Sequence, residues 1–264
     1  MDSLSHRLDE LTTSPRRAGS RRRPAPAPRR SKRLEEVLGG APRRAGATPY
    51  WAVETPFTDF DRQHRVRRSD LAGSLCVESA NSNDLMINPK QALVIDIETG
   101  GFSGTPVFLI GVVPLGAWPP RAYQWLARDY PEEKAILERL ATFARRRTHW
   151  VSFNGKSFDV PFLADRAVVN RVSLDSPTVH VDLLHAARRR WRDQLADCRL
   201  QTLESEILGR RRVGDVSGAD IPDLFHHFVR TGNAAPLAPV LEHNRLDLLT
   251  STELLLQLAK PASS

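Results

Sequence analysis

Hydrophobic residues in the middle of the chain are spaced as in β-strands, in short apolar runs bounded by Gly, Pro and polar residues. The runs LVIDIET, VFLIGVV and AYQWLA follow one another closely, with Gly- and Pro-containing segments between them. Successive strands joined by short turns are typical of an antiparallel meander. Three further runs have the same character, so the predicted strands are residues 50–57, 93–99, 107–113, 122–127, 149–155 and 178–184.

Other segments repeat their apolar residues every three or four positions, which is the spacing of an amphipathic helix. The first helix is predicted from about Pro131, because proline suits a first helical turn. Its apolar stripe consists of Ile136, Leu137, Leu140 and Phe143. The other predicted helices are residues 158–170, 185–195, 201–208 and 236–258. Strands that first pair as hairpins and later alternate with helices predict an α/β fold, with a mixed sheet and helices on both faces.

The charge of the chain is unevenly distributed along its length. The 264 residues include 38 Lys and Arg against 31 Asp and Glu, a formal net charge of +7. Residues 1–48 hold 12 basic and 5 acidic side chains, so they carry the whole excess and residues 49–264 are balanced. This distribution disfavours a basic globular nucleic-acid binder whose charge covers its fold.

The N-terminal segment is also rich in Pro, Ala, Gly and Ser, a composition that buries too little apolar surface to fold. We therefore predict a disordered basic tail over residues 1–48, with short helical turns near residues 4–11 and 34–38. Such a tail could attract nucleic acid in a salt-sensitive manner or serve a protein partner. The rest is predicted to divide into a lead-in strand and irregular segment, the main domain and a flexible C-terminus, at residues 49–90, 91–258 and 259–264 respectively.

Cysteine usage and hydropathy bound the cellular context. Cys76 and Cys198 lie far apart and lack any CxxC or Cys/His spacing, so neither a disulfide framework nor a zinc site is predicted. The N-terminus carries acidic residues and has no apolar stretch typical of a secretory signal. The most apolar segment, residues 108–118, is shorter than the about 20 residues that a membrane span needs. We expect a soluble, cytoplasmic protein with no membrane partner.

Two carboxylates interrupt the apolar run LVIDIET. Side chains alternate along a strand, so Asp96 and Glu98 share a face with Val94 while the Leu and Ile residues point to the other. Like charges side by side repel, and burying a carboxylate is costly unless a cation or a donor compensates it. A divalent metal with oxygen ligands answers both problems. The alternative is a wet sheet edge with two solvated acids.

Two later segments carry further candidates. Asp159 falls in the first turn of the helix after the strand at residues 149–155, where an acid is also favourable without any function. His243 and Asp247 lie four residues apart and therefore on one face of the last helix, where they form either a binding pair or a solvated polar stripe. The sequence GKS at residues 155–157 is not a phosphate-binding loop, because Trp150 stands where that motif requires Gly.

Taken together, DIET, NGKSFD and HNRLD resemble the three motifs of the DEDD exonuclease superfamily, whose fold is ribonuclease H-like. The segments VDLLHAARRRW, CRLQTLESEILG, IPDLF and EHNRLDLL are also similar to the bacterial YprB-type ribonuclease H-like domain. The resemblance covers about residues 50–258 and implies a mixed five-stranded sheet flanked by helices. One departure is visible: three residues separate His243 from Asp247, whereas the superfamily's His subclass has four between them.

By this resemblance, the protein is expected to be a metal-dependent 3′–5′ exonuclease that hydrolyses a strand of DNA or RNA. Asp96, Glu98 and Asp247 would hold one Mg or Mn ion, and Asp96 with Asp159 would hold a second, so that two ions clamp the attacking and leaving oxygens. His243 would orient or deprotonate the attacking water. Substrate contacts are implied for Thr99, Gly100, Asn154 and Lys156. Two rivals are a catalytically silent nucleic-acid-binding module and an endonuclease on the same fold.

Overall fold

A computed structural model of the chain describes residues 33–61, 63, 65–79 and 84–261. Residues 1–32 of the predicted basic tail, including the helical turn predicted near residues 4–11, lie outside the described residues. So do residues 262–264 of the predicted C-terminal segment.

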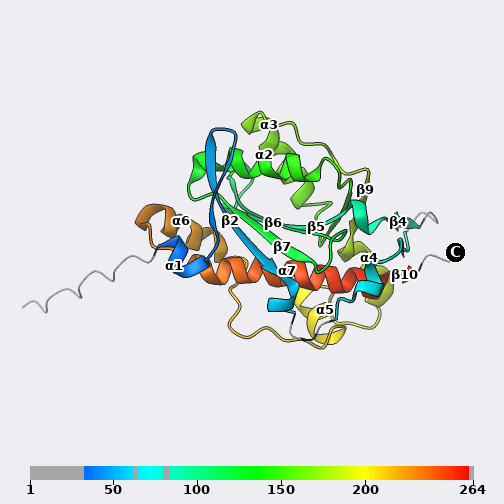
Figure 1. Ribbon diagram of the computed structural model, residues 1–264. Coiled ribbons are helices and arrows are strands. Elements are labelled where there is room, and N and C mark those ends of the chain that lie inside the picture. The colour runs from blue at the N-terminus through cyan, green and yellow to red at the C-terminus, as the bar shows by residue number, and fades with distance from the viewer. Residues whose placement is uncertain (1–32, 62, 64, 80–83, 262–264) are drawn as a thin grey trace, which may run out of the picture. The chain divides into compact units, whose positions relative to one another are not determined.

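The main sheet contains seven strands, in the order β1-β2-β7-β6-β5-β8-β9 (Figure 1). Their bounds are β1 Ala41–Ala45, β2 Thr48–Pro56, β5 Ala92–Thr99, β6 Val107–Pro114, β7 Arg121–Leu126, β8 His149–Ser152 and β9 Val179–Asp182. The predicted mixed α/β sheet is confirmed, but the predicted number of five strands is wrong. The sheet is larger because β2 pairs with β7 and β1 pairs in turn with β2, which extends one edge.

The order of the strands brings the predicted acidic segment to the centre of the sheet. The meander β5–β6–β7 is antiparallel, as its closely spaced apolar runs predict, and Asp96 of β5 lies opposite Gly111 of β6. On its other side β5 pairs in parallel with β8, and β8 pairs in parallel with β9. The carboxyl ends of these three parallel strands therefore meet at one edge of the sheet, where Glu98, Ser152 and Asp182 lie.

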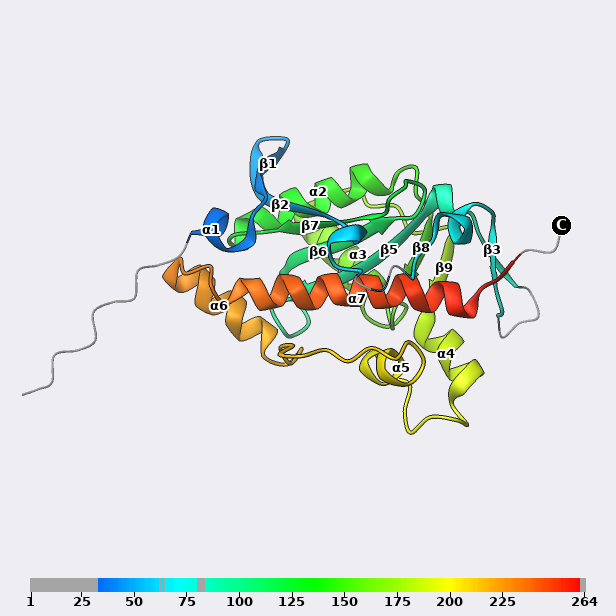
Figure 2. The same ribbon diagram turned by 60° about the horizontal axis from the view of Figure 1, so that its bottom comes forward.

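Helices cover both faces of the sheet, as the alternation of strands and helices predicts. On one face, α2 (Glu133–Ala144) and α3 (Asp159–Asn170) pack on an apolar cluster that includes Leu93, Ile95 and Ile97. The other face is covered by α4 (Leu183–Trp191), α5 (Leu200–Glu206), α6 (Ile221–Thr231) and the long α7 (Leu237–Leu258). Figure 2 shows α7 running along the sheet. On this face the apolar side chains of α7 pack with Val94 of β5 in a second apolar cluster.

The predicted disordered tail is wrong for residues 33–48. Residues Leu34–Leu38 form the short helix α1, as their apolar spacing predicts, and β1 forms a hairpin with β2. Gly46 adopts a φ of 54°, a conformation suited to the tight turn between the strands. An Arg- and Pro-containing segment can form a strand here because β1 is at the sheet edge, where Arg43 and Arg44 stay exposed and Pro42 costs little.

A second, three-stranded sheet lies outside the strands predicted from sequence. It consists of β3 (Leu75–Val77), β4 (Leu85–Ile87) and β10 (Lys260–Pro261), in the order β10-β3-β4. Part of the predicted irregular lead-in is therefore ordered, and the predicted flexible C-terminus is wrong for residues 260–261. These strands are too short to show an alternating pattern. In the described part of the chain, no helix has the length and apolar character needed to cross a membrane.

Candidate active site

Three elements bring the four predicted carboxylates to the same edge of the sheet. Asp96 and Glu98 come from the second half of β5 and point to the α7 face, as their alternation with Ile95 and Ile97 predicts. Asp159 begins α3 and is buried, and Asp247 lies on α7 with a side chain that is 16% exposed.

The four carboxylates influence one another electrostatically. Burial, followed by repulsion from Asp247, raises the pKa values of Asp96 and Glu98 well above their usual range. Burial is also the main cause that raises the pKa of Asp159, to about 7, although backbone N–H groups of Asp159 itself and Ile97 oppose the shift. The four carboxylates come from three separate motifs and form one cluster, in which each negative charge disfavours the others. This cluster of Asp96, Glu98, Asp159 and Asp247 is called the acidic group below.

Carboxylate oxygens, which these four side chains supply, are suitable ligands for hard divalent cations. Hydrogen bonds from Asn244 to Asp96 and from backbone N–H groups to Asp159 lower the two pKa values, but neither outweighs burial. Within the described residues, no three acidic, His or Cys side chains lie close enough to enclose an ion by themselves. Mg²⁺ is commonly held by one or two carboxylates, with waters and substrate phosphate as its other ligands. The arrangement therefore fits ions that are shared with a phosphate-bearing ligand.

A buried amide holds Asp96 against α7. The Asn244 Nδ2 donates to Asp96 Oδ2 at 2.7 Å and to the Asp96 carbonyl at 3.2 Å. Its Oδ1 accepts from Gln124 Nε2 on β7 at 2.9 Å. Gly111 leaves the necessary space, because a Cβ there would lie 2.2 Å from Asn244 Oδ1. One carboxylate of the site is thus oriented by a fully buried network that crosses from β7 to α7.

A buried guanidinium, that of Arg212, contacts Asp247. Arg212, from the segment between α5 and α6, pairs with Glu204 at 2.5 Å, with Asp215 at 3.0 Å and with Asp247 at 2.6 Å. Its side chain is only 6% exposed. Burial raises the pKa of Asp247, and Arg212 followed by His243 lowers it. Arg212 therefore favours the ionised form of the α7 carboxylate.

His243 and Asp247 share a face of α7, as their spacing predicts, with His243 Nε2 at 3.6 Å from Asp247 Oδ2. The opposite ring nitrogen, Nδ1, lies 2.9 Å from Asp215 Oδ1. An ionised carboxylate only accepts hydrogen bonds, so Nδ1 carries the proton and donates it to Asp215. In the neutral ring, Nε2 is then a free acceptor near the carboxylates, which is the arrangement that a base acting on water requires.

The predicted turn after β8 is held by an acid that the sequence analysis did not single out. Asp182, at the end of β9, accepts hydrogen bonds from the backbone N–H groups of Asn154 at 2.9 Å and Lys156 at 3.0 Å. Asn154 adopts a φ of 63°. At Gly155 a Cβ would lie 2.1 Å from Ser152 Oγ and 3.2 Å from Asp159 Oδ2, so the loop packs closely against the acidic group.

The loop after β5 is also anchored. Thr99 is buried, and its Oγ1 accepts a hydrogen bond from the Gly101 N–H at 3.4 Å. The carbonyl of Gly100 accepts from His226 Nε2 on α6 at 3.2 Å, which leaves His226 Nδ1 to accept from the Tyr130 hydroxyl at 2.9 Å. Thr99 and Gly100 thus lie directly beside Glu98, and their contacts with substrate stay a prediction.

Several residues of the site escaped sequence reasoning. Asn244 left a usable signal, since a poor helix former interrupts an apolar helix beside His243 while Gly111 interrupts an apolar strand. Asp182, placed between a strand and a Leu-rich helix, could have been identified as an N-cap. Arg212 gave only the weak signal of the basic run at residues 210–212, which suggests phosphate contacts or a solvated face, and Asp215 gave none. The segment between α5 and α6 has no periodicity and reaches the site only through tertiary folding.

The fold agrees with what comparison with known proteins shows. Residues 93–259 match the model of the RNase H superfamily, and the chain belongs to that superfamily. Among individual proteins, it is 32% identical over 198 residues to the uncharacterized protein YprB of Bacillus subtilis (strain 168). This match covers 73% of the chain and 46% of YprB, so the chain spans about half the length of this relative.

Among solved structures, the chain resembles the family B DNA polymerase from the hyperthermophilic archaeon Pyrobaculum calidifontis, with a TM-score of 0.51 and 16% sequence identity. The similarity covers 63% of this chain and 24% of the polymerase chain. At this level of identity the comparison concerns the fold alone.

Proposed function

We propose that the protein is a divalent-metal-dependent nuclease that removes nucleotides from the 3′ end of a nucleic-acid strand. The observation that carries this proposal is the single acidic group formed by Asp96, Glu98, Asp159 and Asp247 in a domain of the RNase H superfamily. Bringing four mutually repelling carboxylates together in a largely buried group is unfavourable, and bound cations relieve that repulsion. The motif resemblance described above adds the 3′–5′ direction.

In this proposal Asp96, Glu98 and Asp247 would contribute ligands to one Mg²⁺ or Mn²⁺ ion, with water and substrate phosphate as its other ligands, and Asp96 with Asp159 would contribute to a second. When bound, such ions would supply charge stabilisation for the attacking and leaving oxygens of an in-line displacement. Asn244 orients Asp96 through its 2.7 Å hydrogen bond, and Arg212 opposes the rise that burial causes in the pKa of Asp247.

His243 accepts a proton from the attacking water at Nε2, while Asp215 holds the ring through Nδ1 and stabilises the imidazolium that forms. The three-residue separation between His243 and Asp247 suits this role, because both side chains lie on one face of α7 and 3.6 Å apart. The backbone around Thr99 and Gly100 lets the terminal nucleotide lie close to the sheet edge. Asn154 and Lys156 contact a base or a phosphate of the bound strand.

One observation favours a second candidate, a nucleic-acid-binding module without turnover. The ion pair between Arg212 and Asp247 supplies a cation inside the acidic group from the chain itself, so one of the carboxylates has a partner without any metal. Binding that does not lead to product, in the presence of Mg²⁺ and Mn²⁺, would support this alternative. An endonuclease would instead release internal fragments.

The proposal is tested by comparing two acids of the same helix. Asp159 is buried at the start of α3, whereas Asp165 is exposed on its surface. Purified wild type, Asp159→Asn and Asp165→Asn are incubated with single-stranded DNA and RNA in Mg²⁺ or Mn²⁺, and released nucleotides are measured. We expect hydrolysis by the wild type and by Asp165→Asn, and a loss of at least about 100-fold for Asp159→Asn. Equal activity of all three proteins would contradict the assignment of the site.

A further inference from the structure

A separate pocket lies beside the loop that carries Asn154, Gly155 and Lys156. It has a volume of about 230 Å³ and is lined by the end of β9, the first turns of α4 and the β3–β4 sheet. Its apolar wall includes Val77 and Leu85. The pocket is smaller than the roughly 300–1,000 Å³ typical of sites for whole small-molecule ligands, so it suits one chemical group of a larger one.

Three cationic or titratable side chains surround this pocket: Lys156, His185 and Arg189. Lys156, His185 and Arg189 are all exposed, so their polar ends can reach a ligand. His185 and Arg189 are four residues apart on α4 and therefore share one face of that helix. Arg189 donates one hydrogen bond to the Glu78 carbonyl and retains further N–H groups on its guanidinium.

The acid that lines the pocket is already engaged by the protein. The side chain of Asp182 is fully buried, and its two oxygens accept hydrogen bonds from the backbone N–H groups of Asn154, Lys156 and Leu184. Its charge is thus distributed over three donors beneath the loop, and His185 Nε2 lies 3.8 Å away. The exposed part of the pocket is cationic, in a domain whose charges otherwise balance over residues 49–264.

The pocket and the acidic group share the same loop. Lys156 lies three residues before Asp159, and a Cβ at Gly155 would lie 3.2 Å from Asp159 Oδ2. The strands β5, β8 and β9 are parallel, so Glu98, Asp159 and Asp182 lie along one edge of the sheet. A strand with its terminal phosphodiester at the acidic group can therefore continue along this edge and place another phosphate at Lys156.

We propose that Lys156, His185 and Arg189 form a binding site for a backbone phosphate of the substrate strand, at a position away from the bond that is cleaved. This inference rests on the proposed nuclease function and adds a subsite that holds the strand. Arg and Lys recognise phosphate through charge-assisted hydrogen bonds, and such contacts position a strand without reading its sequence. The same chemistry could accept a free phosphate ion, and the experiment below separates the two sources.

The test measures binding and hydrolysis independently. Binding of a labelled single-stranded oligonucleotide is followed by fluorescence anisotropy over a series of NaCl concentrations, on an Asp96→Asn background that leaves the strand intact. Each phosphate contact contributes about 0.7 to the slope of log K against log salt concentration for single strands. We expect Arg189→Ala and Lys156→Ala each to lower the magnitude of the slope by about 0.7, and the double variant to lower it by about 1.4.

Arg188→Ala is the matched control, because it removes the same charge from the neighbouring exposed position of α4. We expect it to leave the slope nearly unchanged, and Arg189→Lys to restore most of the slope while keeping the charge. Melting temperatures identify a variant that loses binding because it loosens the contact with Glu78. Equal slopes for wild type, Arg189→Ala and Lys156→Ala, or equal reductions for Arg188→Ala and Arg189→Ala, would overturn the proposal.

Two further arms separate the other outcomes. If inorganic phosphate binds the wild type and not Arg189→Ala, while oligonucleotide slopes stay equal, the pocket takes a free anion and the strand subsite is wrong. In proteins that retain Asp96, the hydrolysis of long and very short oligonucleotides is compared, and we expect Arg189→Ala to raise KM only for strands long enough to reach the pocket. A protein without hydrolysis whose salt slope still depends on Arg189 would refute the nuclease and retain the phosphate site.

Discussion

The sharpest prediction for the architecture of the site concerns Arg212, a residue that reaches the acidic group from a segment without regular structure. Its guanidinium contacts Glu204, Asp215 and Asp247 at distances of 2.5, 3.0 and 2.6 Å, and its side chain is 6% exposed. Replacing Arg212 with Ala removes the cation and leaves these carboxylates buried. The variant is therefore expected to be less stable even though no apolar core residue changes.

The size of the effect follows from the partners that remain. Removing one partner of a buried ion pair costs about 3–5 kcal/mol when the other charge is left without compensation. Glu204 keeps a second partner in Arg210, and Asp215 keeps one in His243. Asp247 loses Arg212, the main cause that lowers its pKa. We therefore expect Arg212→Ala to lower the free energy of unfolding by about 3 kcal/mol, near the lower limit of that range.

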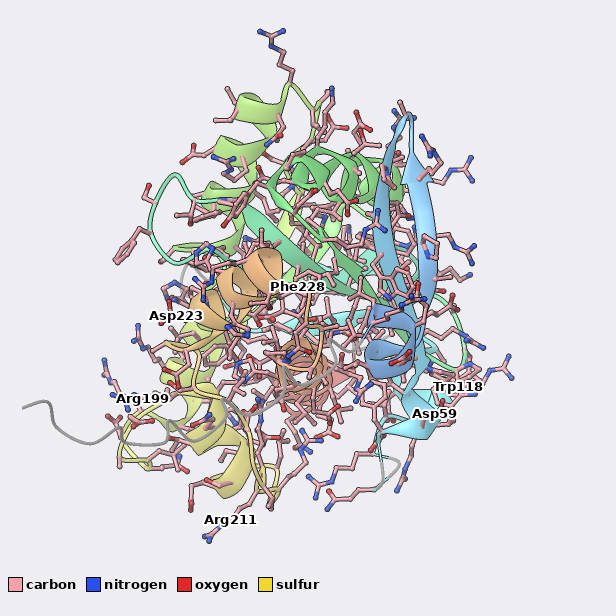
Figure 3. All side chains as sticks on the ribbon, turned by 90° about the vertical axis from the view of Figure 1, so that its left-hand side faces the viewer. Asp59, Trp118, Arg199, Arg211, Asp223 and Phe228 are labelled. Atoms are coloured by element: carbon pink, nitrogen blue, oxygen red, sulfur yellow. The ribbon has the colours of Figure 1, made fainter. Side chains whose placement is uncertain are left out.

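The measurement compares Arg212→Ala with Arg211→Ala in chemical and thermal unfolding without metal. Arg211 is exposed and its side chain points away from the protein at the edge of the view in Figure 3, so its removal deletes an equal charge without touching the network. A loss of about 3 kcal/mol corresponds to a fall in Tm of roughly 6–12 °C for a domain of this size, and Arg211→Ala should change Tm little. Under the proposed function, Mn²⁺ is expected to restore part of the loss, because an ion that binds the folded state alone stabilises it. Equal Tm values for the two variants would refute this account of the network.

Three other predictions test separate parts of the site. In EDTA the free energy of unfolding should fall as pH rises from about 4 to about 7, because burial raises the pKa of Asp159 to about 7 and the folded protein keeps a proton that the unfolded chain has lost. Denaturant titrations at pH 5 and pH 8 should show a smaller difference in unfolding free energy for Asp159→Asn than for the wild type. Equal differences for the two proteins would contradict the assignment. Gly111→Ala should cost about 1–3 kcal/mol by calorimetry, since its Cβ would lie 2.2 Å from Asn244 Oδ1; a wild-type Tm would show that the network tolerates the methyl group. Asp215→Asn should lower kcat by about 10- to 100-fold with little change in KM and shift the pH profile of kcat, because His243 loses the carboxylate that orients it; a change in KM alone would argue against that positioning role.

The parts of the fold that local pattern predicts are those whose apolar residues face a large core. The meander of β5, β6 and β7 and the helices α2, α3 and α7 all bury regular apolar stripes, and each is present near its predicted position. The hairpin of β1 was not predicted because β1 is an edge strand that keeps exposed residues, and the small sheet of β3, β4 and β10 was not predicted because its strands are too short to show a pattern. Their pairing depends on neighbours that are distant in sequence.

The same distinction applies to the site. Asp96 and Glu98 stand out against an apolar strand, so their pattern alone marks them as candidates. Asp159 and Asp247 have ordinary structural explanations when taken singly, and only the resemblance of the three motifs taken together selects them. Arg212 lies in an aperiodic segment and becomes part of the site only through contacts that span 35 residues of the chain to Asp247. Residues that tune or neutralise the carboxylates therefore required the structure.

The central claim is metal-dependent removal of nucleotides from a 3′ end, and it is tested most directly with a single-stranded oligonucleotide labelled at its 5′ end. The labelled products are separated by size over time for the wild type in Mg²⁺ or Mn²⁺, for the wild type in EDTA, and for Asp96→Asn in metal. We predict a ladder of labelled strands that shorten one nucleotide at a time with the wild type in metal, and an intact strand in the other two reactions. Internal fragments alone, shortening in EDTA, or no cleavage under any condition would contradict the claim.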